Sequence, residues 1–186
     1  MQNIEHMFKK LEFITPTLMS VLELFLSDPM REHHQREVAR SAKVSVGSAN
    51  RILKLLADLD MLAGQRRGRM VFYKLNAGDP VVRQFKALLN VYSLKPLLQA
   101  ARHHSRRILL FGRSAQGSDV KESDIDLFVL TSDKGPVRSE ISGSNRKSER
   151  KIAPVIVDAN EFVRLKRNDR ALYENIERGI TLWQAE

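Results

Sequence analysis

The sequence of 186 residues contains no cysteine, which excludes disulfide bonds and thiolate metal sites. It also lacks a run of about 18 apolar residues, the length that a membrane-spanning helix requires. The first ten residues include acids and bases but no apolar core of the length found in signal peptides. Together these absences predict a cytoplasmic protein in a reducing compartment, without a membrane partner.

Acidic residues are missing from one long stretch of the chain. No aspartate or glutamate occurs between residues 80 and 118, whereas Asp119, Glu122, Asp124 and Asp126 follow within the next eight residues. The net charge is +9 and the isoelectric point is about 10. Such a basic excess favours a polyanionic partner such as nucleic acid, although charge alone also fits a solvated basic surface.

The first 79 residues predict three helices followed by a β-hairpin. Apolar residues recur at helical spacing from residue 16 to residue 28, and Asp28-Pro29 ends that segment. A second helix is expected near residues 35–42, and a third helix runs from the N-cap residue Ser45 to about Leu59. Glycine-bounded basic residues at 64–69 precede a β-prone run at 70–75, which is the pattern of a hairpin tip.

This order of elements, and the residues from Gln35 to Leu53 in particular, resembles the winged helix-turn-helix family. In that family the third helix enters the major groove and the hairpin lies along the backbone or minor groove. The resemblance implies double-stranded DNA as a partner. The residues that it nominates for DNA contacts are Ser48, Asn50, Arg51 and Lys54 on the helix and Arg66, Arg67 and Arg69 on the hairpin. Winged helices also serve as dimerisation or protein-docking modules, and this alternative stays open.

The rest of the chain predicts a connecting helix, three strands and a C-terminal helix. The helical pattern covers residues 81–103, and the strands are expected at 108–111, 124–130 and 152–157. Residues 132–151 are polar and predict a loop or a weak helix, whereas residues 160–183 are expected to be mostly helical.

Asp124 and Asp126 carry the clearest chemical signal. Residues i and i+2 of a strand face the same side, so the two carboxylates are expected together. Such a pair can hold Mg²⁺ that bridges a triphosphate. Upstream, ten residues separate Gly112-Arg113 from Asp124, and a glycine turn lets backbone N–H groups approach a phosphate.

The strand, the glycine turn, the ten-residue spacing and the Asp-x-Asp strand together resemble the minimal nucleotidyltransferases of the DNA polymerase β superfamily. The resemblance implies an NTP such as ATP as substrate, Mg²⁺ bound by Asp124 and Asp126, and phosphates bound by Gly112, Arg113 and Ser114. It also implies a protein hydroxyl as the acceptor, as in antitoxins that adenylylate a partner toxin.

Two positions depart from that family pattern. Arg113 stands where the family has a small residue, usually serine, and Ser114 follows one place later. The third carboxylate is expected in the strand at 152–157, where Asp158 at the strand's end is the candidate catalytic residue. The alternative is that Asp158 only caps the segment that follows.

The sequence therefore predicts an α/β protein of the α+β kind. The expected parts are a winged helix-turn-helix domain at 1–79, a connecting helix at 80–104 and a mixed-sheet nucleotidyltransferase-like domain at 105–186. The expected function is nucleotidyl transfer by a DNA-binding protein, and the alternative is a transcription regulator whose inactive domain senses a ligand or supports dimerisation. A homodimer is expected through the connecting helix, which has apolar residues to spare: Phe85, Leu88, Leu89, Val91, Leu94 and Leu97.

Overall fold

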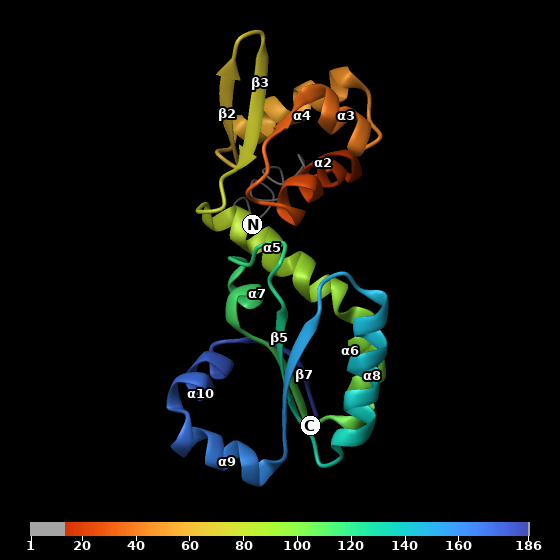
Figure 1. Cartoon of the computed structure of the whole chain (residues 1–186), viewed down its shortest axis with the longest axis vertical. Helices are drawn as coiled ribbons and strands as arrows, with labels where there is room; N and C mark the ends of the chain where they lie inside the picture. Colours follow the sequence, from red (N-terminus) through yellow and green to blue (C-terminus); the bar gives the residue numbers. More distant parts are fainter. Residues whose placement is uncertain (1–13, 186) are drawn as a thin grey trace, which may run out of the picture. The chain divides into compact units, whose positions relative to one another are not determined.

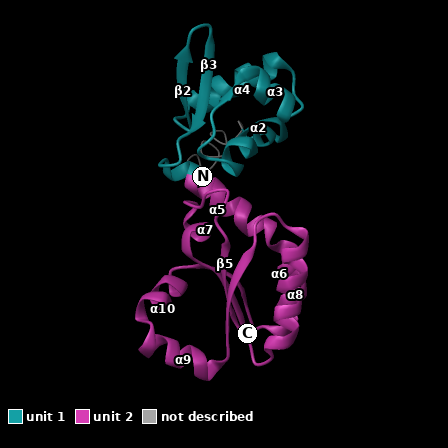
Figure 2. Cartoon of the chain, in the orientation of Figure 1, with its two compact units in different colours: residues 1–82 teal, residues 83–186 magenta. Residues whose placement is uncertain are grey.

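The computed structural model describes residues 14–185 of the chain. The chain divides into two compact units, residues 1–82 and residues 83–186 (Figures 1 and 2). Within the described residues, no helix is both long and apolar enough to cross a membrane. Each unit has its own core and is described by itself.

The first unit contains the three helices and the hairpin that its sequence predicts. The helices are α2 (Pro16–Ser27), α3 (Gln35–Ser41) and α4 (Val46–Asp58). The hairpin strands β2 (Leu62–Arg67) and β3 (Met70–Leu75) are antiparallel, and the short strand β1 (His33–His34) adds to the other side of β3. The Ser45 hydroxyl accepts a hydrogen bond from the Ser48 N–H, which confirms Ser45 as the N-cap of α4.

The core of the first unit joins all three helices. Leu22 and Phe25 of α2, Val38 of α3, and Leu53 and Leu56 of α4 are all fully buried. This burial leaves the opposite side of α4 and most of the hairpin in contact with solvent, because β2 buries only its first residue.

The second unit is built around a four-stranded sheet with helices on both faces. Its elements in chain order are α5 (Pro80–Ser93), α6 (Lys95–Ala101), a short 3₁₀ turn (Arg102–His104), β4 (Arg107–Leu110), α7 (Gly112–Gln116), β5 (Ile125–Leu130), α8 (Lys134–Lys147), β6 (Ile152–Val157), α9 (Ala159–Asn168), α10 (Arg170–Glu177) and β7 (Ile180–Gln184). The helix α5 starts in the first unit and continues from Arg83 in the second.

The strand order is β6-β5-β4-β7, with β5 and β6 parallel and the other pairs antiparallel. The sheet is therefore mixed, as the predicted fold class requires. Residues 134–147, in the segment expected to be a loop or a weak helix, form a full helix. One expectation was wrong at its end, because residues 180–184 are not helical but pair with β4 as a strand, which suits the β-branched and aromatic side chains there.

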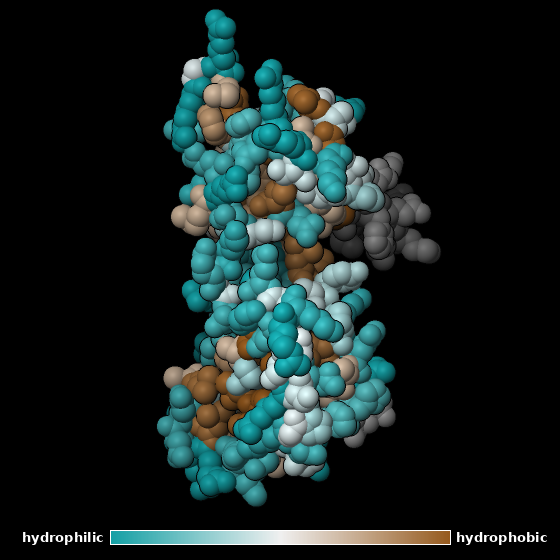
Figure 3. All heavy atoms as spheres, turned by 45° about the vertical axis from the view of Figure 1, so that its right-hand side comes forward, coloured by the Kyte–Doolittle hydropathy of each residue, from teal (hydrophilic) through white to brown (hydrophobic). Residues whose placement is uncertain are grey.

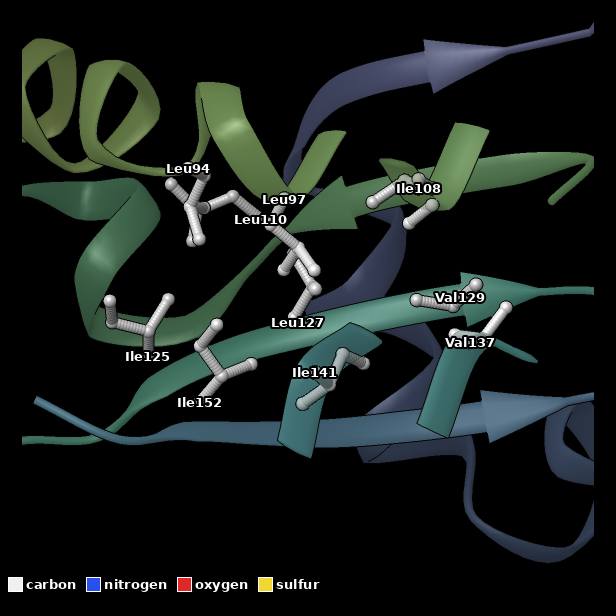
Figure 4. Close-up of a cluster of buried hydrophobic side chains, with 11 residues drawn as sticks. Leu94, Leu97, Ile108, Leu110, Ile125, Leu127, Val129, Val137, Ile141 and Ile152 are labelled. Atoms are coloured by element: carbon white, nitrogen blue, oxygen red, sulfur yellow. The ribbon is translucent and has the colours of Figure 1, made fainter. Parts of the chain in front are cut away.

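Alternate residues of β5 enter two separate cores. Ile125, Leu127 and Val129 pack under α6 and α8, where Figure 4 shows them with Val137 and Ile141. Phe128 faces the other side, which α9 and α10 cover (Figure 1). Since side chains alternate along a strand, Asp126 lies on the same face as Phe128.

Candidate functional site

Asp124 and Asp126 lie at the beginning of β5, as the sequence predicts. Asp124 is exposed and directly precedes the strand, whereas Asp126 is half-buried within it. Burial raises the pKa of the Asp126 carboxyl; the Arg113 guanidinium nearby lowers this pKa, and the Asp124 carboxylate raises it. The three side chains therefore form one electrostatic group at the beginning of β5.

Gly112 brings the turn after β4 into contact with this group. Its φ is +64°, a left-handed conformation that favours glycine. A Cβ at this position would overlap the Asp126 carboxylate oxygen Oδ2 and lie 3.1 Å from its Cγ. In addition, the Phe111 N–H donates to the Asp126 carbonyl at 3.0 Å. The backbone of the glycine turn is thus held directly against the Asp126 side chain.

The side chains of the two residues after Gly112 lie on opposite sides of the turn, one exposed and one buried. The Arg113 side chain is exposed and lies near Asp126, where it can meet an anionic ligand. Ser114 is fully buried, and its hydroxyl accepts from Arg150 at 3.2 Å and donates to the Asp124 carbonyl at 3.5 Å. The Ser114 hydroxyl is therefore enclosed and already has partners within the chain, so phosphate binding by Ser114, which stays a prediction, would use its backbone N–H.

Asp158 is not placed with the other two acids. The parallel register sets Asp126 opposite Ala153, and Asp158 follows β6 five residues later, about 16 Å further along the strand direction. There its side chain accepts from the Glu161 N–H at 2.9 Å, and the Glu161 carboxylate accepts from the Asp158 N–H at 2.8 Å. This reciprocal capping box starts α9. The candidate third acid is thus a helix cap.

The donor set at β5 fits Mg²⁺ that is shared with a nucleotide. Across residues 14–185, no group of three or more histidine, aspartate or glutamate side chains is gathered for a metal ion. Two neighbouring carboxylates are available instead, and Mg²⁺ is commonly bound through one or two carboxylates plus substrate phosphates. Asp124 and Asp126 are the residues that would hold it.

A group of buried polar residues behind the glycine turn was not predicted from the sequence. Lys86, Asn90 and Asp119 are between 3% and 6% exposed, and Arg150 reaches them from the segment before β6. A signal was present in the sequence, because Val82, Lys86 and Asn90 of α5 and Leu94 directly after it follow one another at intervals of four. A lysine and an asparagine within a buried helical stripe require polar partners.

The residues nominated for DNA contacts lie on the surface of the first unit to different extents. Arg51 and Lys54 are exposed on α4, whereas Asn50 is half-buried and the half-buried Ser48 hydroxyl accepts from Ser45 at 2.9 Å. The exposed hairpin residues are Arg66, Arg67 and Arg69. Figure 3 shows hydrophilic side chains projecting at the hairpin tip.

Arg67 differs from its two neighbours on the hairpin because it is already paired. It binds the Glu32 carboxylate at 2.7 Å, and its guanidinium lies 5.1 Å from the centre of the Phe72 ring. Arg67 is therefore held along the hairpin surface.

Comparison with known proteins found one family model that matches part of the second unit. Residues 94–180 match the family model of the nucleotidyltransferase domain. Among solved structures, a mutant of the MntA–HpeT toxin–antitoxin pair shares 19% identity over 52% of this chain and 74% of that chain, with a TM-score of 0.37. A candidate nucleotidyltransferase from Sulfolobus solfataricus shares 14% identity over 56% of this chain and 85% of that chain, with a TM-score of 0.34. A search of curated proteins gave no match.

The family match covers β4, the glycine turn, the Asp124–Asp126 strand and β6. Residues 94–180 of the second unit therefore match a nucleotidyltransferase domain, and this part of the sequence resemblance is confirmed. In the same chain, a unit of three helices and a hairpin precedes it.

Proposed function

We propose that the second unit binds an NTP together with Mg²⁺ at Asp124 and Asp126 and transfers its nucleotidyl group to an acceptor. The observation that carries this proposal is the contact between the Gly112 turn and the Asp126 carboxylate, with Asp124 and Arg113 beside it. A bare backbone turn, a cation and two acids are the parts that a metal-bound triphosphate needs.

Each residue has a separate role in this proposal. Asp124 and Asp126 hold the metal ion, which when bound offsets the negative charge on the phosphates. Gly112 lets the phosphates approach the backbone, because it has no side chain in the way. Arg113 supplies a positive charge that serves the phosphates and also keeps Asp126 more readily ionised, since it lowers the pKa of that carboxyl.

The acceptor that we propose is a protein hydroxyl, as the sequence resemblance implies. The test uses the full-length protein, ATP labelled at the α-phosphate, Mg²⁺ and a cell lysate. A labelled acceptor protein is expected with the native chain and is lost in Asp126→Asn, while Asp169→Asn, a change in the turn before α10, leaves labelling intact. If the native chain labels nothing and its melting temperature is unchanged by ATP and Mg²⁺, the proposal is wrong.

A second candidate function is that of a regulator whose domain binds nucleotide without transferring it. The observation that favours it is the position of Ala153, which faces Asp126 from β6 where another carboxylate could complete a metal site. This candidate predicts a raised melting temperature with ATP and Mg²⁺ but no labelled product. The pair of readouts, melting and labelling, separates the two functions.

We further propose that the first unit is a winged helix-turn-helix domain that binds double-stranded DNA. Support comes from the exposed Arg51 and Lys54 on α4 and from the exposed Arg66 and Arg69 at the end of the hairpin. Their charge suits phosphates, and Arg51 can also reach a guanine edge. Together the two proposals describe a DNA-binding nucleotidyltransferase.

A further inference from the structure

A buried group of charged and polar side chains lies directly behind the glycine turn. Lys86 and Asn90 come from the buried face of α5, Asp119 from the loop between α7 and β5, and Arg150 from the segment before β6. Lys86 is 5% exposed, Asn90 6% and Asp119 3%, whereas the Arg150 side chain is 26% exposed. Three segments far apart in the sequence thus meet at one place.

Asp119 is the centre of this group. Its oxygen Oδ1 accepts from Asn90 Nδ2 at 3.0 Å, and its Oδ2 pairs with Arg150 Nη1 at 3.1 Å and with Lys86 Nζ at 3.4 Å. Lys86 also donates to the Asp119 carbonyl oxygen. A single buried carboxylate therefore pairs with two cationic side chains, which are the partners that a buried charge requires.

Arg150 links this centre to the residues of the candidate site. Its Nη2 donates to the Ser114 hydroxyl at 3.2 Å, and its Nε donates to the Ser123 carbonyl at 3.1 Å. Asn90 holds the same turn from the other side, because its Nδ2 donates to the Ser114 carbonyl at 2.9 Å. Ser114 lies in α7, two residues after Gly112, and Ser123 directly precedes Asp124.

The end of the turn is also fixed against α5. Gly117 ends α7 with a φ of +63°, and a Cβ at this position would collide with the Arg83 backbone, whose carbonyl carbon would lie only 2.7 Å away. The turn therefore has α5 behind it, Asp126 in front of it and Arg150 at its side. The contacts with α5 and Arg150 involve none of the groups that are proposed to face a ligand.

We propose that Arg150, together with Asp119, Lys86 and Asn90, is a positioning group that sets the glycine turn relative to Asp124. The planar guanidinium joins the turn through Ser114 and the start of β5 through Ser123, so it fixes the spacing between the phosphate-binding and metal-binding parts. This inference rests on the proposed function for its consequence, since a fixed spacing matters only if both parts bind one ligand.

The first test needs no nucleotide and measures amide hydrogen exchange in the full-length protein. Arg150→Met removes the guanidinium and leaves Lys86 paired with Asp119. The reporters are the Gly117 and Ser118 N–H groups, which bond to the Arg113 carbonyl and close the turn. Their exchange is expected to rise by about tenfold or more, while exchange of the β4 and β5 amides changes little.

Arg146→Met is the matched control, because this exposed arginine lies four residues earlier in the last turn of α8. It is expected to leave exchange at the turn unchanged. The Arg150 Nη1 also donates to Asn90 Oδ1 at 2.9 Å. Arg150→Lys keeps the charge but cannot reach Ser114, Ser123 and Asn90 together, so the raised exchange is expected to persist. Unchanged exchange in Arg150→Met, an equal rise throughout the sheet, or full recovery in Arg150→Lys would each overturn the proposal.

The second test measures binding of ATP with Mg²⁺ by calorimetry at a temperature where the variants are folded. A positioning role predicts that Arg150→Met weakens binding by about tenfold or more, while Arg146→Met binds like the native chain. Native affinity in Arg150→Met despite a lower melting temperature would show a merely structural role and overturn the proposal. If the native protein binds no ATP, the proposed function fails, and the exchange measurement alone then decides whether Arg150 positions the turn.

Discussion

Asp126 on β5 lies directly opposite Ala153 on the parallel strand β6. Paired residues of neighbouring strands point to the same face, and the next pairs along show this, because Phe128 and Val155 both enter the core under α9 and α10. The Ala153 methyl group therefore stands beside the Asp126 carboxylate. Any acid placed at residue 153 would join the Asp124–Asp126 pair.

The change Ala153→Asp is expected to create a third carboxylate at this place. Without metal, the added like charge should lower the melting temperature, because it faces the half-buried Asp126. With Mg²⁺ alone, the loss should be recovered, since the ion now has three ligands. Thermal melting with and without Mg²⁺ checks this, and Ala153→Asn serves as the control without the added charge. If Mg²⁺ does not change the melting temperature of Ala153→Asp, β5 and β6 do not share a metal site.

Local sequence patterns predicted the pair Asp124–Asp126 and the glycine turn, because the period of a strand and the left-handed preference of glycine act over a few residues. They failed for Asp158, since the partner of Asp126 depends on the register between β5 and β6, and the helix α8 separates these strands in the chain. The burial of the Ser114 hydroxyl could not be predicted either, because its partner Arg150 is 36 residues away in the sequence.

Substitutions of Asp158 test directly whether this residue is a helix cap or the third carboxylate of the site. Asn is as good an N-cap as Asp, so Asp158→Asn is expected to keep both the stability and any transfer activity of the native chain. Asp158→Ala removes the cap and should lower the melting temperature without affecting the binding of ATP and Mg²⁺. Melting curves and calorimetry separate the two effects. Loss of nucleotidyl transfer in Asp158→Asn, with stability retained, would restore Asp158 as a catalytic residue.

The hairpin arginines are expected to contribute unequally to DNA binding. Arg66→Ala and Arg69→Ala should each weaken binding to all sequences and reduce the salt slope by about one. Arg67→Ala should have a smaller effect, because Glu32 already pairs with this side chain. Arg51→Ala should instead cost about 1–3 kcal/mol mainly at preferred sites.

Salt-dependent titration of duplex DNA measures all four changes. Lys74→Ala is the control, since Lys74 lies on β3 at the end away from the hairpin tip. Equal salt slopes for the native chain and the Arg66→Ala, Arg69→Ala double variant would exclude the hairpin as a DNA-binding element.

Burial reduces the number of residues that are candidates for the interface of the predicted homodimer. Leu94 and Leu97 are buried in the core of their own unit, at 2% and 6% exposure, so they cannot serve a partner. Leu88 and Tyr92 are 58% and 65% exposed on α5, one turn apart. The double change Leu88→Ala and Tyr92→Ala is expected to convert the dimer into a monomer in light scattering at tens of micromolar. The control is Val163→Ala on α9, where the side chain is 57% exposed. A monomer mass for the native chain in the same measurement would contradict the predicted homodimer.

The pH dependence of stability should report on Asp126. Burial raises the pKa of this carboxyl above its ordinary value of 3.8. Ionising it therefore costs the folded state more than the unfolded state. The cost is present above the raised pKa and disappears as the pH falls toward 3.8. In the metal-free protein, Asp126→Asn removes the cost, so the variant should melt at or above the native chain at pH 7. This difference should vanish at about pH 4.

With ATP and Mg²⁺ bound, the native chain is expected to be more stable than Asp126→Asn, the reverse of the order expected without ligand. At 100 times the dissociation constant, ATP with Mg²⁺ should stabilise the native chain by about 2.7 kcal/mol and raise its melting temperature by several degrees. Asp126→Asn should show no such rise, because it has lost a ligand for the ion. Calorimetric melting at pH 4 and pH 7, each with and without ATP and Mg²⁺, measures both effects. A native chain that is more stable than Asp126→Asn at pH 7 without metal would show that the Asp126 charge stabilises the fold. In that case the carboxylate would have a structural partner instead of being held for a metal ion.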